Sequence, residues 1–326
     1  MAQLWKSSRW LRHYDWDWET APWPEVEHRM AAYRARILPR KFIYHVLNVA
    51  RRQTDIDPDA PPQDLALQFL EYQDQLAELI EAFREPQPVG AILQPPLRDR
   101  LGGATPALTM FKHLKAMGWI VPAETEEPPD EKAIFLASNM LYGIFQTQDE
   151  MVAAMEIVRE VEPQTMMEIG TARGGSLFCW AQLARPDALL LSLDLPGGRW
   201  GGGYDVEQIQ HFRQFLSPTQ RLLSILGDSQ AAETVTLVND ALADRQLDVL
   251  YIDGDHTYQG AKNDFLNYRP FVREGGLILF HDINPPKPGK ETSDVEVYLL
   301  WEELKKEYAC EEIWHPERPV FGVVRL

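Results

Sequence analysis

The feature that most constrains the fold is the rhythm of residues 131–326, where short apolar runs alternate with stretches of helical periodicity. The runs are TMMEI (165–169), ALLLSLD (188–194), RLLSIL (221–226), DVLYID (248–253) and GLILFH (276–281). Helix-compatible spans separate them, near 174–185, 205–216, 231–244 and 257–272. Continuous apolar strands joined by helices are typical of a parallel sheet covered on both faces. A further run, VFGVVRL at 320–326, predicts an antiparallel edge strand.

A Pro- and Glu-rich run at 122–131 precedes this pattern and predicts a domain boundary. We therefore expect two regions: a mainly helical N-terminal region of unknown role over 1–130, and an α/β domain over 131–326. In the first region, residues 63–84 carry apolar side chains at the i, i+3 and i+4 spacing of a helix. Residues 104–121 predict a shorter helix that ends at Gly118.

The beginning of the chain differs from the rest in composition. Residues 1–24 contain five tryptophans without regular spacing, which predicts an irregular segment docked on another surface. Residues 25–52 have a helical pattern that Pro39 interrupts. Residues 1–52 hold ten Lys/Arg and five Asp/Glu, a net of +5, against −22 for the remainder. This basic head could bind an anionic partner, but we favour pairing with the chain's own acidic surface.

The overall charge and composition exclude several classes of protein. A net charge of −17 argues against nucleic-acid binding, because a polyanion would be repelled. The two cysteines, Cys179 and Cys310, have neither the number for a disulfide framework nor zinc-site spacing. The sequence has no apolar signal segment and no run long enough to cross a bilayer, so we expect a cytoplasmic protein without a membrane partner.

The residues that end the first three runs are candidates for ligand binding, because open α/β sheets bind ligands at the carboxyl ends of their strands. The first run ends in Glu168-Ile169-Gly170-Thr171-Ala172-Arg173-Gly174-Gly175-Ser176, a Gly-rich turn before a helix. Such a turn lets the backbone approach a ligand, although a purely structural turn would have the same pattern. The second run ends at Asp194, an acid suited to ribose hydroxyls, and the third ends in Gly227-Asp228-Ser229, an acid suited to adenine. Together they predict an adenosine-containing cofactor.

The spacing of the first turn is E-x-G-x-x-x-G-G, which departs from the G-x-G-x-x-G dinucleotide fingerprint. It resembles the first motif of class I S-adenosylmethionine-dependent methyltransferases. Four ordered segments, MEIGTARGGS, LSLDL, YIDGDHTYQGAKNDF and REGGLILFHDI, resemble methyltransferase family 24, with its macrolide- and cephalosporin-tailoring O-methyltransferases. The resemblance covers about residues 140–326 and implies a Rossmann-like, mostly parallel sheet that binds S-adenosylmethionine.

The resemblance also implies roles for individual residues. Glu168, Gly170 and Gly174 would cradle the methionine part of the cofactor, with Thr171 beside them. Asp194 would bind the ribose and Asp228 the adenine. Gln146, in the stretch before the first run, is a further candidate for the pocket wall.

Five ionisable residues end the fourth and fifth runs: Asp253, Asp255, His256, His281 and Asp282. Buried side by side, they would need a metal, a substrate or mutual hydrogen bonds. In metal-dependent relatives an acid at the place of Asp253 and an acidic pair after the fifth strand hold Mg²⁺. Here the pair reads His281-Asp282, and imidazole suits Mn, Fe or Zn better than Mg. Asp253, His281 and Asp282 are thus candidate ligands of a divalent metal, Mg or Mn, and the sequence leaves metal binding open.

The candidate catalytic residues are His256 and Asp253. A neutral imidazole can take a proton from a hydroxyl near pH 7, which makes His256 the candidate general base. The alternative is a structural histidine held by Asp255. Two loops, 196–204 with its five glycines and 285–294, are candidate flaps over the substrate.

These patterns predict methyl transfer from S-adenosylmethionine to a hydroxyl of a small molecule, a sugar or a polyketide-type natural product. The alternatives are N-methylation on the same fold and a non-catalytic cofactor-binding scaffold whose helical N-terminal region is the working part. An NAD-dependent oxidoreductase is disfavoured by the glycine spacing. We also expect the N-terminal region to be a possible surface for homo-oligomer formation.

Overall fold

The structure is a computed structural model, and it describes residues 3–7, 75, 78–116, 119–125, 128–142, 144–197, 204, 209, 212–213, 216–217, 219–285, 295–315 and 318–326. The chain divides into two compact units, Met1–Gly143 and Ile144–Leu326. Of the described helices, none is both long and apolar enough to traverse a membrane. The predicted helical pattern of residues 25–52 lies outside the described residues.

The first unit contains a small antiparallel sheet that the sequence did not predict. Its strands are β1 (Leu4–Ser7), β2 (Gln87–Pro88) and β3 (Ile120–Pro122), in the order β2-β1-β3. The segment expected to be irregular thus begins with a strand, in which Trp5 pairs with Gln87 on one side and Pro122 on the other. Strands of two to four residues are too short to show the alternation that identifies a strand in a sequence.

The helices of the first unit agree in part with the prediction. They are the 3₁₀ helix η1 (Val89–Leu93), α4 (Leu97–Arg100), α5 (Ala104–Ala116) and α6 (Glu131–Tyr142). Helix α5 confirms the helix expected at 104–121 and buries Met110, Phe111 and Leu114. Gly118 lies outside the described residues, as does most of the helix expected at 63–84, of which residues 78–82 are helical.

The division between the units falls after Gly143, not at the predicted position between residues 130 and 131. The Pro- and Glu-rich run begins in β3, and the carboxylate of Asp130 accepts a hydrogen bond of 2.7 Å from Ala133 N at the start of α6. This run is therefore a loop that leads into a helix of the first unit. Its composition marks a loop without telling which unit the next helix joins.

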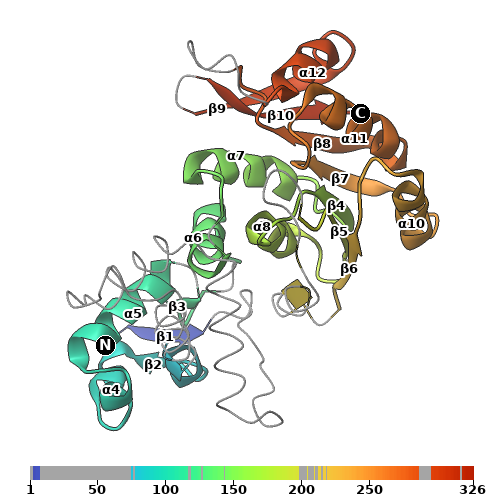
Figure 1. The fold of residues 1–326 in the computed structure, drawn as a ribbon. Helices are drawn as coiled ribbons and strands as arrows, with labels where there is room; N and C mark the ends of the chain where they lie inside the picture. Colours follow the sequence, from blue (N-terminus) through green and yellow to red (C-terminus); the bar gives the residue numbers. More distant parts are fainter. Residues whose placement is uncertain are drawn as a thin grey trace. The chain divides into compact units, whose positions relative to one another are not determined.

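The second unit is built on the predicted sheet, now seven-stranded in the order β6-β5-β4-β7-β8-β10-β9 (Figure 1). Strands β4 (Thr165–Ile169), β5 (Leu189–Asp194), β6 (Arg221–Leu226), β7 (Leu247–Ile252) and β8 (Val272–His281) are parallel and confirm the five apolar runs. Strand β10 (Pro319–Arg325) is antiparallel, as expected. The sheet is Rossmann-like, as the sequence predicted.

Strand β10 is an inner strand, which corrects the expectation of an edge. It lies between β8 and a strand that the sequence did not predict, β9 (Ala309–Trp314), which pairs with it antiparallel. In β9 only Ile313 is buried, and Glu311 and Trp314 are exposed. An edge strand with charged side chains lacks the continuous apolar run by which the inner strands were recognised.

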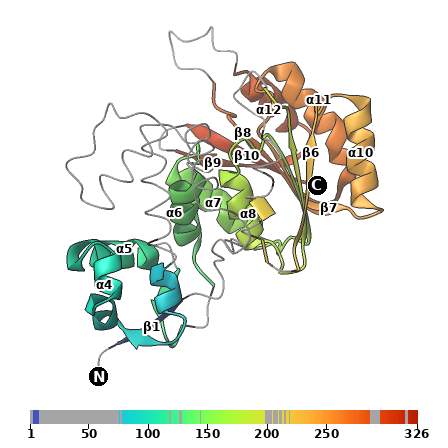
Figure 2. The ribbon, with the colours of Figure 1, turned by 60° about the horizontal axis from the view of Figure 1, so that its bottom comes forward.

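Helices cover both faces of this sheet. Helices α10 (Ala232–Leu242), α11 (Tyr258–Tyr268) and α12 (Val297–Leu304) lie on one face, and α7 (Gln148–Arg159) and α8 (Gly175–Leu183) lie on the other (Figure 2). Helices α8, α10 and α11 confirm three predicted spans, whereas α7 and α12 were not predicted. The helix expected at 205–216 falls mostly outside the described residues.

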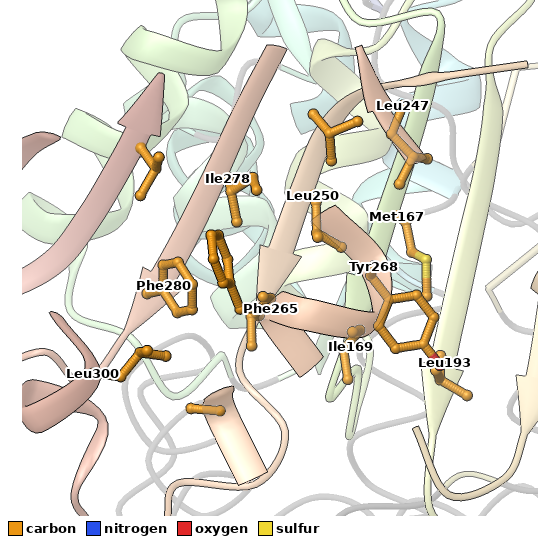
Figure 3. Close-up of a cluster of buried hydrophobic side chains, with 14 of the residues drawn as sticks. Met167, Ile169, Leu193, Leu247, Leu250, Phe265, Tyr268, Ile278, Phe280 and Leu300 are labelled. Carbon is orange, nitrogen blue, oxygen red and sulfur yellow. The ribbon is translucent and has the colours of Figure 1, made fainter. Parts of the chain in front are cut away.

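One core of the second unit lies between the sheet and the α10–α12 layer. Figure 3 shows Phe265 and Tyr268 of α11 packed against side chains of β4, β5, β7 and β8. Each of these buried side chains contributes about 1.5–3 kcal/mol by leaving water. The core anchors the strand bodies and thereby positions the strand ends, where the candidate site lies.

Candidate functional site

The turn between β4 and α8 adopts the backbone that its glycines permit. Gly170 and Gly174 have φ angles of +92° and +85°, a region that favours glycine. A Cβ at Gly170 would lie 2.1 Å from the carbonyl oxygen of Asp253, and one at Gly174 would lie 2.3 Å from the Phe212 ring. Both glycines are therefore required by the fold itself. The fold by itself explains glycine at these two positions, so the glycines alone do not indicate a ligand.

Asp194 holds this turn from the neighbouring strand β5. Its side chain is buried, and its carboxylate accepts hydrogen bonds from Ala172 N at 2.5 Å and from Leu195 N at 2.7 Å. The hydroxyl of Thr171 lies 2.7 Å from that of Ser192 on β5. The side chains of Asp194 and Thr171 thus join the β4 turn to β5, which leaves Asp194 at the strand end where the sequence placed it.

Asp228 follows β6 and is exposed. Its Oδ1 accepts a hydrogen bond of 2.9 Å from Gln230 N, and Gly227 N donates to the carbonyl of Asp194 at 2.9 Å. The backbone bond brings the ends of β5 and β6 side by side. The three predicted cofactor-binding segments therefore lie at adjacent strand ends, in the order β6-β5-β4.

Glu168 is a buried acid beneath the β4 turn. Its side chain is 1% exposed, and within the described part of the chain neither carboxylate oxygen has a hydrogen-bond partner. Burial raises the pKa of Glu168 to about 8, although the nearby hydroxyls of Ser176 and Thr171 lower it somewhat. At pH 7 this group is therefore mostly protonated, and a positively charged ligand group at hydrogen-bond distance would favour its carboxylate form.

Four ionisable side chains meet at the ends of β7 and β8. His256 Nδ1 lies 3.0 Å from Asp282 Oδ2, and His256 Nε2 lies 3.5 Å from Asp253 Oδ1. His281 Nδ1 lies 3.3 Å from Asp253 Oδ1 and 3.5 Å from Asp282 Oδ2. The two imidazoles thus bridge the same two carboxylates. Among the described residues, Asp253, His256 and Asp282 each place one possible ligand atom within 4.8 Å of the others.

Charge pairing dominates the electrostatics of this cluster. Burial alone would lower the pKa of His281, but Asp253, Asp282 and Glu150 raise it well above its ordinary value. Burial likewise opposes the rise in the pKa of His256, which Asp282 and Asp253 cause. The pKa of Asp282 is well below its usual range, because His256 and His281 outweigh the effect of burial. The charged imidazoles and carboxylates of the cluster therefore stabilise one another.

Asp255 does not join the cluster, which corrects the expectation that five groups converge. Its carboxylate accepts hydrogen bonds from Thr257 N at 2.9 Å and from Gln230 Nε2 at 3.3 Å. His256 forms ion pairs with Asp253 and Asp282, and the alternative in which Asp255 holds it stays a prediction. The turn into α11 directs neighbouring side chains to different sides, which a sequence pattern does not reveal.

Three buried polar residues complete the cluster. Asp253 Oδ2 accepts hydrogen bonds from the Tyr251 hydroxyl at 2.8 Å and from Gln146 Nε2 at 2.9 Å. Glu150 Oε1 lies 3.8 Å from His281 Nε2 and also accepts a hydrogen bond from Thr147 N. Gln146 was a sequence candidate, whereas Glu150 and Tyr251 were missed. Thr147-x-x-Glu150 has the spacing of a capping box, which indicates a helix start but not what the acid contacts.

The two candidate flaps lie mostly outside the described residues. Of the first, Tyr204 is described: its side chain is buried, and its hydroxyl donates to the carbonyl of Ser192 at 2.8 Å. This bond fixes the end of the 196–204 loop against β5.

Comparison with known families agrees with this architecture. Residues 167–283 match the model of a family described as a methyltransferase domain. They span the β4 turn, both acids at the ends of β5 and β6, and the cluster at the ends of β7 and β8. Residues 167–283 are thus similar to a methyltransferase domain.

Individual relatives are more distant. The uncharacterized protein y4gI of Sinorhizobium fredii is 28% identical over 153 residues, 46% of this chain and 16% of that protein. The uncharacterized protein R132 of Acanthamoeba polyphaga mimivirus is 28% identical over 159 residues, 47% of this chain and 66% of that protein. The match thus spans less than two thirds of either relative. An O-methyltransferase from Bacillus cereus, solved with S-adenosylhomocysteine, is 14% identical with a TM-score of 0.43, over 63% of this chain and 94% of that one.

Proposed function

We propose that the second unit transfers a methyl group from S-adenosylmethionine to a hydroxyl of a small molecule. The observation that carries the proposal is the position of Glu168, Asp194 and Asp228 at three adjacent strand ends of a methyltransferase domain. The three acids differ in burial in a way that suits the parts of the cofactor. Glu168 is enclosed, Asp194 is buried at the mouth of the turn, and Asp228 is exposed.

In this proposal each acid recognises one part of the cofactor. Glu168 receives the ammonium group of the methionine part, whose positive charge supplies the partner that its buried carboxylate lacks in the described chain. Asp194 accepts hydrogen bonds from the ribose hydroxyls, and Asp228 lies beside the adenine. Gly170, Thr171 and Gly174 shape the turn over which the cofactor lies.

The acceptor hydroxyl lies beside the cluster at the ends of β7 and β8. His256 is the proposed general base. Asp282 Oδ2, 3.0 Å from Nδ1, accepts a hydrogen bond from the N–H of that nitrogen. In this tautomer the lone pair is on Nε2, which faces Asp253 Oδ1. Nε2 and Asp253 together can receive the hydroxyl proton, while placement in line with the sulfonium supplies most of the acceleration.

The same cluster fits a divalent cation. Neighbouring ligand atoms on an octahedral ion with bonds of about 2.1 Å lie about 3 Å apart. His281 Nδ1 lies at a similar distance from both carboxylates, 3.3 Å from Asp253 Oδ1 and 3.5 Å from Asp282 Oδ2. Asp253, His281 and Asp282 are the proposed ligands. A bound cation would lower the pKa of the acceptor hydroxyl.

Calorimetry and a methyl-transfer assay test the proposal. The full chain should bind S-adenosylhomocysteine and not NAD, and should methylate hydroxyl-bearing acceptors in a panel of small sugars and polyketides, as read by mass spectrometry. Preference for NAD would overturn the proposal. Methylation of amines alone would indicate an N-methyltransferase, and cofactor binding without turnover on any acceptor would indicate a cofactor-binding scaffold.

A further inference from the structure

Arg173, in the turn between β4 and α8, is a half-buried cation that the proposed mechanism does not use. Its guanidinium carbon lies 4.3 Å from the centroid of the Phe145 ring, and among the described residues no acid forms an ion pair with it. Burial lowers the pKa of Arg173, and no described carboxylate offsets this effect. Arg221 and Arg245 also lack an acid partner in the described part of the chain, but they are exposed, so water solvates them.

The contact with Phe145 stabilises this cation only in part. The face of an aromatic ring attracts a guanidinium, but the ring offers no acceptor to the N–H groups at the edge of the guanidinium plane. A carboxylate accepts a parallel pair of hydrogen bonds from that edge, which is why Arg recognises it so well. Phe145 is 66% exposed, so a small molecule can reach the stack. Arg173 on Phe145 thus has the chemistry of a binding site for an anionic group.

The stack lies beside the place proposed for the acceptor. Phe145 directly precedes Gln146, whose Nε2 donates to Asp253 Oδ2 at 2.9 Å. The same segment packs against the start of α8, where a Cβ on Gly175 would lie 2.9 Å from Ile144 Cβ. The segment that carries the aromatic ring therefore contacts both the β4 turn and the cluster at the ends of β7 and β8. An acceptor whose hydroxyl lies at the cluster has the guanidinium at its side.

The carboxylate of the cofactor's methionine part is the other candidate partner of Arg173. In the proposed function the ammonium group on the same carbon atom lies at Glu168, so this carboxylate must also lie close to Glu168. The charged groups that raise the pKa of Glu168 are Asp253 and Asp194, whereas no acid, Glu168 included, raises the pKa of Arg173. The guanidinium is therefore directed away from Glu168, which favours the acceptor as its partner.

We propose that Arg173, stacked on Phe145, binds a carboxylate of the acceptor, and that the acceptors are therefore hydroxy acids. The inference rests on the proposed function, because it names the class of compound that the same site methylates. A singly charged carboxylate suits the site better than a phosphate, because Asp253, Asp282 and Glu150 in the adjacent cluster repel a dianion more strongly. The guanidinium supplies the local positive charge that an anionic acceptor needs there.

Matched acids and esters test the proposal. The full chain, with and without saturating S-adenosylhomocysteine, is titrated calorimetrically with glucuronate, salicylate and mandelate, and with the methyl ester of each. We expect at least one acid to bind at least about 10-fold more tightly than its ester, because the ester cannot form the charge-assisted hydrogen bonds. Methyl transfer to the same compounds, read by mass spectrometry, should follow the same preference.

Arg173→Gln should remove this preference. Affinity for the acid should fall about 10- to 100-fold, while affinity for the ester should change less than about threefold. Arg173→Lys keeps the charge but loses the planar fork, so its effect should be intermediate. Phe145→Leu removes the ring face and should weaken binding of the acid about two- to fivefold.

Arg269→Gln is the matched control and should leave both affinities unchanged. Arg269 is also half-buried and also lies over an aromatic ring, with its guanidinium carbon 5.2 Å from the Tyr308 centroid. It follows the last residue of α11, at the opposite end of that helix from the cluster.

The proposal would be overturned if no acid bound, if acids and esters bound equally tightly, or if Arg173→Gln left their ratio unchanged. It would also be overturned if Arg173→Gln weakened binding of S-adenosylhomocysteine but not of methylthioadenosine, which lacks the amino-acid part. Arg173 would then bind the carboxylate of the cofactor. Failure of S-adenosylhomocysteine to bind in every preparation would count against the proposed function instead, because the preference for acids is also measured in the cofactor-free chain.

Discussion

The edge of the sheet at which the parallel strands end has two halves, one at β4, β5 and β6 and one at β7 and β8. Different kinds of hydrogen bond and ion pair stabilise them. At the ends of β5 and β6, single acids bond to backbone N–H groups, as Asp194 does to Ala172 N and Leu195 N. At the ends of β7 and β8, side chains bond to side chains, and two imidazoles bridge two carboxylates. The first half is held by main-chain geometry. The second is held by charge compensation, which a cation or a substrate can rearrange.

This difference suggests that one half of the edge binds the cofactor and the other carries out the methyl transfer. A turn fixed by its backbone presents the same shape before and after a cofactor binds, so little ordering cost opposes binding. A cluster of paired ionisable groups can exchange one partner for another at small cost, because each group is already desolvated. We therefore expect substitutions in the first half to change cofactor affinity and substitutions in the second to change turnover.

Gly170 is the point at which the halves meet, and its replacement should have the largest effect. In Gly170→Ala the new Cβ would lie 2.1 Å from the backbone carbonyl oxygen of Asp253, so β4 and β7 would have to separate at their ends. We expect a loss of at least about 3 kcal/mol in the free energy of unfolding, measured with urea.

Gly197→Ala is the matched control for this prediction. Gly197 also has a positive φ angle, +71°, but a Cβ there meets no atom of the described residues within 4 Å. It should cost only the backbone strain, about 1–2 kcal/mol. Equal losses in the two variants would mean that the close approach of β4 to Asp253 does not matter.

His256→Ala should reduce turnover, which depends on the cluster at the ends of β7 and β8, without weakening cofactor binding. Loss of a general base typically reduces turnover by about 10²–10⁴-fold, and affinity for S-adenosylhomocysteine should remain within about twofold. The checks are kcat with a responsive acceptor and calorimetry with the cofactor product. His315→Ala, a histidine outside the cluster that pairs with Asp149, should retain full turnover. Full activity in His256→Ala would return His256 to a structural role.

Asp264 lies on α11, the helix that follows β7. Its burial predicts that the stability of the protein depends on pH. It is fully buried, burial raises its pKa to about 7, and among its described neighbours neither oxygen has a hydrogen-bond partner. The unfolded chain loses this proton near pH 4 and the folded chain only near pH 7. The free energy of unfolding should therefore fall as the pH rises across this window, with a slope of about 1.4 kcal/mol for each increase of one in pH.

Asp264→Asn should remove that slope. Its free energy of unfolding should match that of the wild type near pH 4 and should exceed it by a few kcal/mol above pH 7, because the amide carries no charge to bury. Urea unfolding at several pH values measures both curves, and the difference between them isolates Asp264 from other acids such as Glu168. Parallel curves would mean that the carboxyl is ionised in the folded chain.

Asp194→Ala tests the first half and should have the smallest effect. It removes a charge-assisted contact to the ribose, so affinity for S-adenosylhomocysteine should weaken by more than about 1 kcal/mol. Turnover at saturating cofactor should change less than in His256→Ala. Leu195 N and Ala172 N lose an acceptor as well, so Asp194→Asn is the companion variant that keeps an oxygen for one of them. Unchanged affinity in both variants would mean that the ribose lies elsewhere.

Several parts of this protein were accessible from the sequence because their signal is local. Five apolar runs identified the five parallel strands, and the signal is strongest in β4 and β5, which are buried throughout. The glycines of the β4 turn and the acids after β5 and β6 followed from the strand ends. Strand β9 was missed because an edge strand needs no such run, and the strands of the first unit because they are very short.

The residues that end each parallel strand can be deduced from the sequence, because the apolar run shows how long the strand is and how deeply it is buried. The side-chain contacts between those strand ends depend on the tertiary structure. The turn into α11 sends Asp255 to Gln230 and His256 to Asp282, although they are neighbours in the chain. Tertiary packing also brings Glu150, which is distant in the sequence, to the far side of His281. Side-chain direction and long-range pairing arise from packing, which no local pattern encodes.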